Sequence, residues 1–454
     1  MKKRQFLKNS SLLLGANLVL PMVGCESGSQ KEGGSLRSNW AGNFTYSTGI
    51  LDKPDGESAL RSYVSNQRKI KVLGTRHSFN AIADSKSRHL SLADMDSGIQ
   101  LSTDGSTVIV NGALQYGVLA RRLQEEGLAL HNLASLPHIS IAGACATGTH
   151  GSGDQNGNLS TAVKQMEMVK ANGESQVFSE DIDPEALQAS VVHLGALGVV
   201  TRMHLRVGPT FDIRQYVYEN LPLSTLRLHF DSVFSSGYSV SLFTDWQNDR
   251  VNQWWIKKKV VDQEESMPEN LLGASLAPDH LHPIKEISAI NCTEQMGLPG
   301  AWHERLPHFK MDFTPSSGEE LQSEYFVPRS QAVAAINEMY SMGEQIYPYL
   351  LISEIRSIKQ DALWLSPAYG RDSIAIHFTW KPDWKNVSEL LPRIEAKLKP
   401  FQVRPHWGKL FTLDRAYLHG QYERMNDFLQ LRRDMDSSGK FVNDFLQKNL
   451  LGES

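Results

Sequence analysis

The stretch from Leu133 to Gly153, LASLPHISIAGACATGTHGSG, constrains the fold more than any other part of the chain, because it joins many small residues to few obstructing side chains. Its glycines, Gly143, Gly148, Gly151 and Gly153, let backbone N–H groups approach a ligand closely. The interleaved serine and threonine hydroxyls add hydrogen bonds without bulk. The stretch therefore favours a diphosphate cradle, although a tight loop packed against its own domain is the alternative that small residues alone leave open.

Composition limits the classes of partner. The chain has 454 residues, of which 41% are hydrophobic, so it can bury two sizeable cores. A net charge of −4 and a pI of about 6.4 give no basic footprint for nucleic acid or an anionic membrane surface. Cys145, Cys292 and the histidines do not fall at metal-ligand spacings, and no metal is predicted. Neither a Rossmann fingerprint nor a Walker A motif is present.

The N-terminus has the pattern of an export signal. Lys2, Lys3 and Arg4 precede an apolar run from Leu12 to Val23, which is too short to span a bilayer. Cys25 follows small residues just past this run, as in a bacterial lipobox. Residues 3–8, KRQFLK, also resemble a twin-arginine signal in which lysine replaces the first arginine. We therefore expect a signal peptide over 1–25, a lipid anchor on Cys25 at the periplasmic side of a bacterial membrane, and a flexible tether over 26–38.

Helical and strand patterns alternate without a regular βαβ rhythm, which favours an α+β fold. Leu60, Tyr63 and Val64 have helical spacing, and so does the face that runs from Tyr116 to Leu123 before Gly127. Strands are predicted over 69–73, 108–110 and from 199 to 207. A hairpin is predicted where 163–169 and 176–179 flank Asn172-Gly173.

Two later stretches, 352–358 and 374–380, alternate polar and apolar residues as strands do. On each strand the polar residues project from one face, and Ile355, Phe378 and Trp380 project from the other. Polar residues that alternate along a strand in this way usually lie on a solvent-facing surface of the sheet. A face that gathers carboxylate, guanidinium, imidazole and hydroxyl groups also suits recognition of polyols, whose hydroxyls donate and accept. The residues on that face are Glu354, Arg356, His377 and Thr379.

Motifs along the whole chain resemble those of one flavoprotein family. They are VLGTRHSFN at 72–80, ASLPHISIAGACATGTHGSG at 134–153, LGALGVVT at 194–201 and HWGK at 406–409, joined by NCTEQ, WHERLPHF, FTPSSG, LSPAYGRD and HFTW. Together they resemble the alditol (xylitol) oxidase and aldonolactone oxidase branch of the vanillyl-alcohol-oxidase (PCMH-type) FAD flavoproteins. The resemblance runs from about Asn39 to the C-terminal helix.

The resemblance implies the architecture. An FAD-binding domain of two α/β subdomains over 39–210 is expected to be split around an antiparallel-sheet substrate (cap) domain over 211–400. Residues 401–454 would then complete the FAD domain. The protein is expected to be a monomer.

The resemblance also implies the site. His77 matches the histidine that joins covalently to the flavin. The other expected cofactor residues are Val72, Leu73, Gly74, Thr75, Arg76, Ser78, Ser135, Ser140, Gly143, Thr147, Gly195, Gly198, Val199, Val200 and His406. The expected substrate residues are Ser135, Glu354, Arg356, His377, Thr379 and Lys409, and Lys409, Arg356 and Glu354 are the expected catalytic residues.

The implied reaction is oxidation of the terminal primary alcohol of an alditol, of the xylitol or sorbitol type, to the aldose. FAD supplies the redox chemistry, and O2 would be reduced to H2O2. Lys409 would polarise the reacting hydroxyl and Arg356 would stabilise negative charge, unless both simply form a charge network with Glu354. Three alternatives remain: a sugar-1,4-lactone oxidase, a dehydrogenase that passes electrons to a carrier, and a sugar-binding lipoprotein without turnover.

Overall fold

The computed structural model describes residues 35–96, 98–261, 267–312 and 319–452, and these belong to one folded unit that runs from Gly34 to Ser454. The predicted signal peptide, the lipobox cysteine Cys25 and most of the predicted tether lie outside the described residues. Within the described residues, no helix is both long and apolar enough to cross a membrane.

The first subdomain is a small parallel sheet in the order β1-β3-β2, built from β1 (Leu51–Asp52), β2 (Lys71–Val72) and β3 (His89–Leu90). Helix α1 (Glu57–Asn66) covers it, because Leu60 and Val64 recur one turn apart and pack with Ile70 and Leu90 in a separate core. The helix and the strand predicted in this region are confirmed.

The second subdomain is a five-stranded antiparallel sheet in the order β4-β5-β9-β7-β8. The predicted hairpin is confirmed, since β7 pairs antiparallel with β8 and Gly173 adopts the positive φ that such a turn needs. The strands are β4 (Gln100–Leu101), β5 (Thr107–Asn111), β7 (Val163–Val169), β8 (Ser175–Ser179) and β9 (Val199–Arg206), and the helices are α2 (Tyr116–Glu125), α3 (Ile141–Ala146) and α4 (Pro184–Ser190). A two-stranded ribbon joins β6 (Leu128–Ala129) to β10 (Gly208–Pro209).

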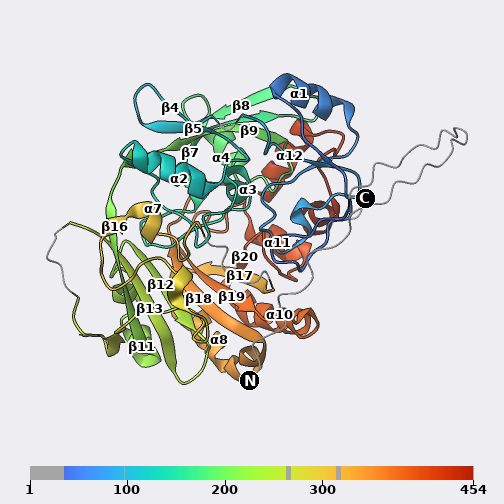
Figure 1. Cartoon of the computed structure of the whole chain (residues 1–454). Coiled ribbons are helices and arrows are strands. Elements are labelled where there is room, and N and C mark those ends of the chain that lie inside the picture. The colour runs from blue at the N-terminus through green and yellow to red at the C-terminus, as the bar shows by residue number, and fades with distance from the viewer. Residues whose placement is uncertain (1–34, 97, 262–266, 313–318, 453–454) are drawn as a thin grey trace, which may run out of the picture. The chain divides into compact units, whose positions relative to one another are not determined.

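A ten-stranded sheet follows, with the order β14-β15-β11-β13-β12-β18-β19-β17-β20 and with β16 beside β11. All pairings of this sheet, which lies in the lower half of Figure 1, are antiparallel. One of its faces can therefore be polar and the other apolar. Its strands are β11 (Asp212–Pro222), β12 (Ser239–Thr244), β13 (Arg250–Lys259), β14 (Asn270–Leu271), β15 (Ala274–Leu276), β16 (Gly300–Ala301), β17 (Leu321–Pro328), β18 (Leu350–Ile358), β19 (Ser373–Trp380) and β20 (Arg404–Pro405). Because β20 pairs with β17, the sheet continues past the cap boundary predicted at residue 400.

Helices cover the apolar face of this sheet. Phe378 and Trp380 of β19 share a buried cluster with the apolar residues of α10 (Trp384–Leu398), and α8 (Ala332–Ser341) packs beside α10. The remaining helices of this part are α5 (Leu223–Leu228), α6 (Phe230–Phe234), α7 (Trp302–Arg305) and α9 (Gly343–Ile346).

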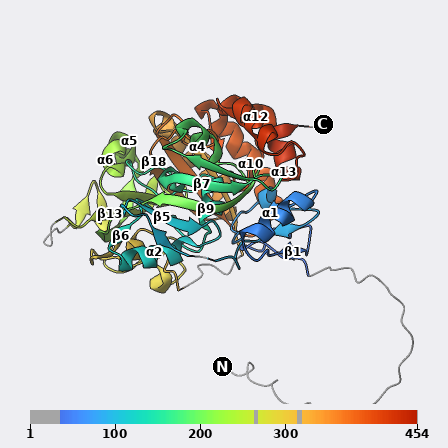
Figure 2. The ribbon, with the colours of Figure 1, turned by 90° about the horizontal axis from the view of Figure 1, so that it is seen from above.

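The chain finally returns to the first subdomain. Helices α11 (Arg415–Gln421), α12 (Met425–Met435) and α13 (Asp444–Leu446) follow the large sheet, and Figure 2 shows α12 and α13 on the same side as α1. Lys440, just before α13, donates from its ammonium to the backbone oxygens of Val64 and Ala171. Both ends of the described chain thus contribute to the α/β part of the molecule.

Candidate active site

One cavity of about 690 Å³ takes residues from the glycine-rich stretch, from the turn after β2 and from the polar face of the ten-stranded sheet. This size suits a small-molecule site. Nearly all of the predicted site residues line it: Val72, Leu73, Gly74, Thr75, Arg76, His77, Ser78, Ser135, Ser140, Gly143, Thr147, Gly195, Gly198, Val200, Glu354, Arg356, His377, Thr379, His406 and Lys409. Val199 is the exception, because its side chain packs in the separate core under α1.

The glycines of the cavity wall lie where a side chain would not fit. A Cβ atom on Gly74 would lie 2.6 Å from Oγ of Ser140, and one on Gly143 would lie 2.7 Å from the same atom. Only a residue without a side chain fits so close to Ser140, and both glycines also line the cavity. The stretch is therefore tightly packed, as in the alternative interpretation, and it also forms a wall of the cavity.

A buried lysine fixes another part of this wall. Leu194 and Gly195 both have positive φ, and Nζ of Lys71 donates to their backbone oxygens at 3.3 and 3.0 Å. A third bond from Nζ reaches the backbone oxygen of Phe441 at 3.2 Å. Lys71 therefore ties the 194–200 turn to the C-terminal segment that packs behind it.

His77 lies in a turn where the preceding residue, Arg76, has a φ of 66°. Backbone N–H of Ser140 donates to Oγ1 of Thr75 at 3.0 Å, so the Thr75 hydroxyl can donate to Nδ1 of His77, also at 3.0 Å. Trp40 stacks on the ring with centroids 5.3 Å apart. Burial lowers the pKa of His77 to about 4, so the imidazole is neutral near pH 7. Its Nε2 is buried and has no hydrogen-bond partner among the described residues.

These features fit a flavin dinucleotide. An unpaired nitrogen on a neutral imidazole is a suitable group to join to a ring substituent, and it lies beside backbone that can approach a diphosphate. The cavity continues from this wall to the polar face of the ten-stranded sheet. A cofactor held by the glycine-rich stretch and the His77 turn would therefore meet a substrate held by the polar face of the sheet.

The polar face of the sheet is set by strand register. Glu354 of β18 pairs with His377 of β19, and His377 pairs with Glu324 of β17, so the three lie in one row across neighbouring strands. The prediction that Glu354, Arg356, His377 and Thr379 share one face is confirmed. All four are buried along the cavity wall, and the solvent-facing alternative is wrong.

Glu324 is the centre of the charge network, and sequence reasoning missed it. Its carboxylate is fully buried and accepts from Nζ of Lys409 and from Nη2 of Arg356, at 2.6 Å each. Nε2 of His150 lies 3.2 Å away. Burial opposes ionisation, but Lys409 and Arg356 outweigh it and hold the pKa of Glu324 well below its usual range. Lys409 is thus paired with Glu324, whereas the sequence-based alternative had paired it with Glu354.

Lys409 also begins a hydrogen-bonded chain. Its Nζ lies 2.7 Å from Nδ1 of His377, and Nε2 of His377 lies 3.0 Å from Oγ1 of Thr379. Burial, reinforced by Lys409, lowers the pKa of His377 to about 4, so its ring is neutral. It accepts from Lys409 and donates to Thr379, whose own hydroxyl proton is left for a ligand. Burial also lowers the pKa of Lys409, while Glu324 opposes that shift.

Arg356 joins both walls of the site. Its guanidinium donates to Oγ of Ser135 at 3.3 Å and to the backbone oxygen of His150 at 3.4 Å, both from the glycine-rich stretch. Nε of Arg356 also lies 3.6 Å from Oε1 of Glu354. Because a guanidinium stays charged in proteins, it is a permanent positive charge beside Lys409.

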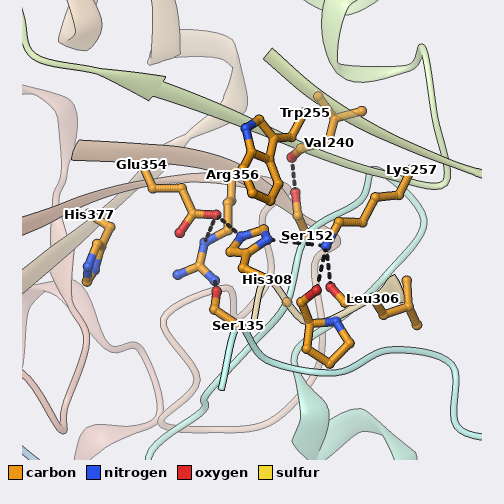
Figure 3. Close-up of polar contacts among 12 residues, drawn as sticks. Ser135, Ser152, Val240, Trp255, Lys257, Leu306, His308, Glu354, Arg356 and His377 are labelled. Atoms are coloured by element: carbon orange, nitrogen blue, oxygen red, sulfur yellow. Dashed lines mark hydrogen bonds and ion pairs between the residues drawn. The ribbon is translucent and has the colours of Figure 1, made fainter. Parts of the chain in front are cut away.

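His308 is the second residue that sequence reasoning missed. Its Nε2 donates to Oε1 of Glu354 at 2.7 Å (Figure 3). His308 follows α7 in a segment without regular structure, so no strand or helix period marks it. The WHERLPHF motif that contains it was the available signal. Glu324 had no such signal, because β17 reads LQSEYFVP and does not alternate polar and apolar residues.

Two family models each match a part of the chain, and curated proteins match it over nearly its full length. The FAD binding domain model matches residues 52–179, and the D-arabinono-1,4-lactone oxidase model matches residues 302–449. Alditol oxidase from Streptomyces sp. (strain IKD472 / FERM P-14339) is 43% identical over 418 residues, which are 91% of this chain and 99% of that protein. L-gulonolactone oxidase from Mus musculus is 25% identical over 90% of this chain and 97% of that protein.

A solved structure shows the same fold. Cholesterol oxidase from Brevibacterium sterolicum superposes with a TM-score of 0.72 over 91% of this chain and 96% of its own, at 15% identity. The predicted α+β, PCMH-type architecture with a large antiparallel sheet is confirmed. Identity of 43% over nine-tenths of the chain shows the family as well as the fold. The chain belongs to the alditol oxidase family of FAD-linked oxidoreductases.

Proposed function

We propose that the protein oxidises the terminal primary alcohol of an alditol, of the xylitol or sorbitol type, to the corresponding aldose, and that O2 takes the electrons and becomes H2O2. The observation that carries this proposal is the meeting of Lys409, Arg356, Glu354 and Thr379 in the cavity that also contains His77. An open-chain polyol presents a row of hydroxyls, each of which donates and accepts. The paired donors and acceptors of this wall match that row.

Lys409 has the geometry of the residue that polarises the reacting hydroxyl. An ammonium has three donors, and two of them go to Glu324 and His377. The third position has no acceptor among the described residues, and we assign it to the substrate oxygen. Because burial lowers the pKa of Lys409, its neutral form is more accessible than that of an ordinary lysine, and in that form the third position is a lone pair that can take the hydroxyl proton. Arg356 would favour the negative charge that a bound flavin gains when it is reduced.

The neighbouring hydroxyls are held by Glu354, Thr379 and Ser135. Burial opposes ionisation of Glu354, but Arg356 and His308 hold its pKa well below the usual range, so it acts as a carboxylate acceptor. Thr379 donates, because His377 already occupies its acceptor site. Ser135 and Thr379 stand on opposite walls, so together they would hold a substrate that crosses the cavity.

FAD, when bound, supplies the hydride-accepting ring and the route for electrons to oxygen. We assign the glycine-rich stretch and the 194–200 turn to its diphosphate and ring, and His77 to covalent attachment. The neutral, buried imidazole described above supports this assignment.

Oxidation of a sugar-1,4-lactone, with O2 or another electron acceptor, is the second candidate. The match of residues 302–449 to the D-arabinono-1,4-lactone oxidase model favours it, because that range includes Glu324, Glu354 and Lys409. A lactone ring needs a broad pocket, whereas an extended polyol needs a line of partners such as the row along β18, β19 and β17.

One panel of substrates separates these candidates. H2O2 release would be measured in air with xylitol, sorbitol, shorter polyols and aldono-1,4-lactones, and in parallel with an artificial electron acceptor under argon. Polyol-dependent H2O2 is the expected result. Turnover of lactones alone would support the second candidate, and turnover with the artificial acceptor but without H2O2 would make the protein a dehydrogenase.

We also propose that the protein works as a lipid-anchored monomer on the periplasmic side of a bacterial membrane. The charged start, the apolar run of residues 12–23 and Cys25 in that order support this location. The tether of residues 26–38 would keep the enzyme clear of the lipid surface.

A further inference from the structure

A second lysine–histidine pair lies beside Glu354. Its His308 lines the cavity, and its Lys257 contacts His308 but is not one of the lining residues. Lys257 is on β13 and is buried, with 1% of its surface exposed. Its Nζ has three acceptors: the backbone oxygens of Leu306 and Pro307 at 2.5 and 3.1 Å, and Nδ1 of His308 at 3.2 Å (Figure 3). Three acceptors match the three N–H groups of an ammonium.

The ring of His308 can carry its proton on one nitrogen only. Nε2 lies 2.7 Å from the carboxylate oxygen Oε1 of Glu354, and two lone pairs would repel at that distance, so Nε2 bears the proton. Burial and the charge of Lys257 lower the pKa of His308 to about 4, so the ring is neutral and Nδ1 is an acceptor. Lys257 supplies the matching donor. It therefore selects the tautomer of His308.

Aromatic side chains hold the ring in this orientation. Trp255 and Phe243 meet it edge-on, with centroids 5.2 and 5.5 Å away. The backbone N–H of His308 donates to the oxygen of Ser135 at 3.2 Å, so the residue is also fixed against the opposite wall of the site. His308 thus has little freedom except the position of its proton.

The proton on Nε2 of His308 acts on the carboxylate of Glu354. In the described part of the chain, its contacts with His308 and Arg356 are both made to Oε1. Figure 3 shows the other oxygen turned toward the side of His377. A carboxylate anchored through one oxygen presents the second one to a ligand in a fixed direction.

We propose that Lys257 and His308 are positioning residues, which hold Glu354 ionised and aimed at a substrate hydroxyl by fixing the proton of His308 on Nε2. The inference rests on the proposed function where it assigns a substrate hydroxyl to Glu354. The bond to Nδ1 of His308 sets Lys257 apart from Lys71 and Lys440, whose ammonium groups meet only backbone oxygens among the described residues.

The tautomer is measured without any substrate. The FAD-loaded protein, labelled with 15N-histidine, would be studied by long-range 1H–15N correlation NMR from pH 5.5 to 7, and the His308 signals would be assigned by their loss in His308→Gln. The range stays below about 7, the value to which burial lowers the pKa of Lys257. A neutral ring protonated on Nε2 is expected throughout. A ring protonated on Nδ1, or an imidazolium, would overturn the inference whatever the substrate proves to be.

Kinetics test the link to substrate. Lys257→Met removes the charge that lowers the pKa of His308, so the imidazolium forms at higher pH. As a cation 2.7 Å from Oε1, it makes the carboxylate of Glu354 a weaker acceptor for a substrate hydroxyl. KM for the polyol should rise about tenfold or more and should rise further as pH falls from 7 to 5.5, with a smaller change in kcat. In His308→Gln the side-chain amide donates to Glu354 and has no tautomer that Lys257 could select. Adding Lys257→Met to this variant should therefore change KM less than about threefold.

Lys440→Met is the matched control. Lys440 is also a buried lysine held by backbone oxygens, those of Val64, Ser65 and Ala171, but it supports the C-terminal segment. Its replacement should lower stability and leave the pH dependence of KM unchanged. Equal pH profiles for Lys257→Met and wild type would show that Lys257 is only structural. If the wild-type NMR result holds and no polyol is turned over, the proposed function fails and the Lys257–His308–Glu354 geometry stands.

Discussion

The ammonium nitrogen of Lys409 lies 2.6 Å from Oε2 of Glu324, a fully buried carboxylate whose other oxygen pairs with Arg356. Lys409 and Arg356 therefore meet Glu324 in the space that would surround the reacting alcohol, and the carboxylate of Glu354 lies 3.6 Å from Nε of Arg356. Glu324 compensates the charges of both cations inside the protein, where little water can solvate them, and its bond to Lys409 orients that side chain along the cavity wall. Without that anion, burial and Arg356 would lower the pKa of Lys409 further.

Replacement of Glu324 tests this relationship. Glu324→Gln should lower the free energy of unfolding by about 3 kcal/mol, because Lys409 loses its carboxylate partner and Arg356 keeps only Glu354. It should also move the pH profile of flavin reduction to lower pH, because Glu324 raises the pKa of Lys409. Glu395→Gln is the control, since Glu395 is buried but bonds to the uncharged Tyr325 and Thr412. An unmoved pH profile in Glu324→Gln would contradict the role of Glu324.

Covalent attachment of FAD depends on His77 in our account. Acid-precipitated wild-type protein should stay yellow, while His77→Ala should release its colour to the supernatant. His419→Ala is the control, because His419 of α11 bonds to the backbone oxygen of Leu450, does not line the cavity and should not affect the linkage. Loss of colour from the wild-type pellet would show that the flavin is not covalently bound.

Much of the site was predictable because β-strands have a simple period. A repeat of two places Glu354 with Arg356 and His377 with Thr379, and the glycine-rich stretch marks the cofactor wall. Strand register was not predictable, and it is register that brings Glu324 of β17 into the row of Glu354 and His377. His308 was missed for another reason, since its place depends on tertiary contacts with Ser135 and Glu354.

The free energy of unfolding should fall as the pH is lowered, because His308 and His377 are neutral in the folded protein. The pKa of His308 and of His377 is about 4 in the folded protein, against about 6.5 in an unfolded chain. Between these values the unfolded state binds more protons, so unfolding becomes easier as pH falls. Each residue should cost about 2 kcal/mol between pH 7 and pH 5. Urea unfolding at both pH values should show a smaller loss in His308→Gln, and an identical loss would contradict the neutral state of His308.

The N-terminus should be processed. Mass spectrometry of the native membrane fraction is expected to find a chain that begins at a lipid-modified Cys25. Cys25→Ala should release active enzyme from that fraction. A cytosolic protein with an unmodified Met1 would contradict both export and the anchor.

The most direct measurement follows flavin reduction by a polyol under anaerobic stopped-flow conditions, in wild type and in Lys409→Met. The substitution shortens the side chain by one heavy atom and removes the amino group that the account places on the reacting hydroxyl. Reduction should slow by about two to four powers of ten, with covalent FAD retained and reoxidation by O2 less affected. Reduction within a few-fold of the wild-type rate, about 1 kcal/mol or less, would show that Lys409 is only a structural partner of Glu324 and would contradict the account.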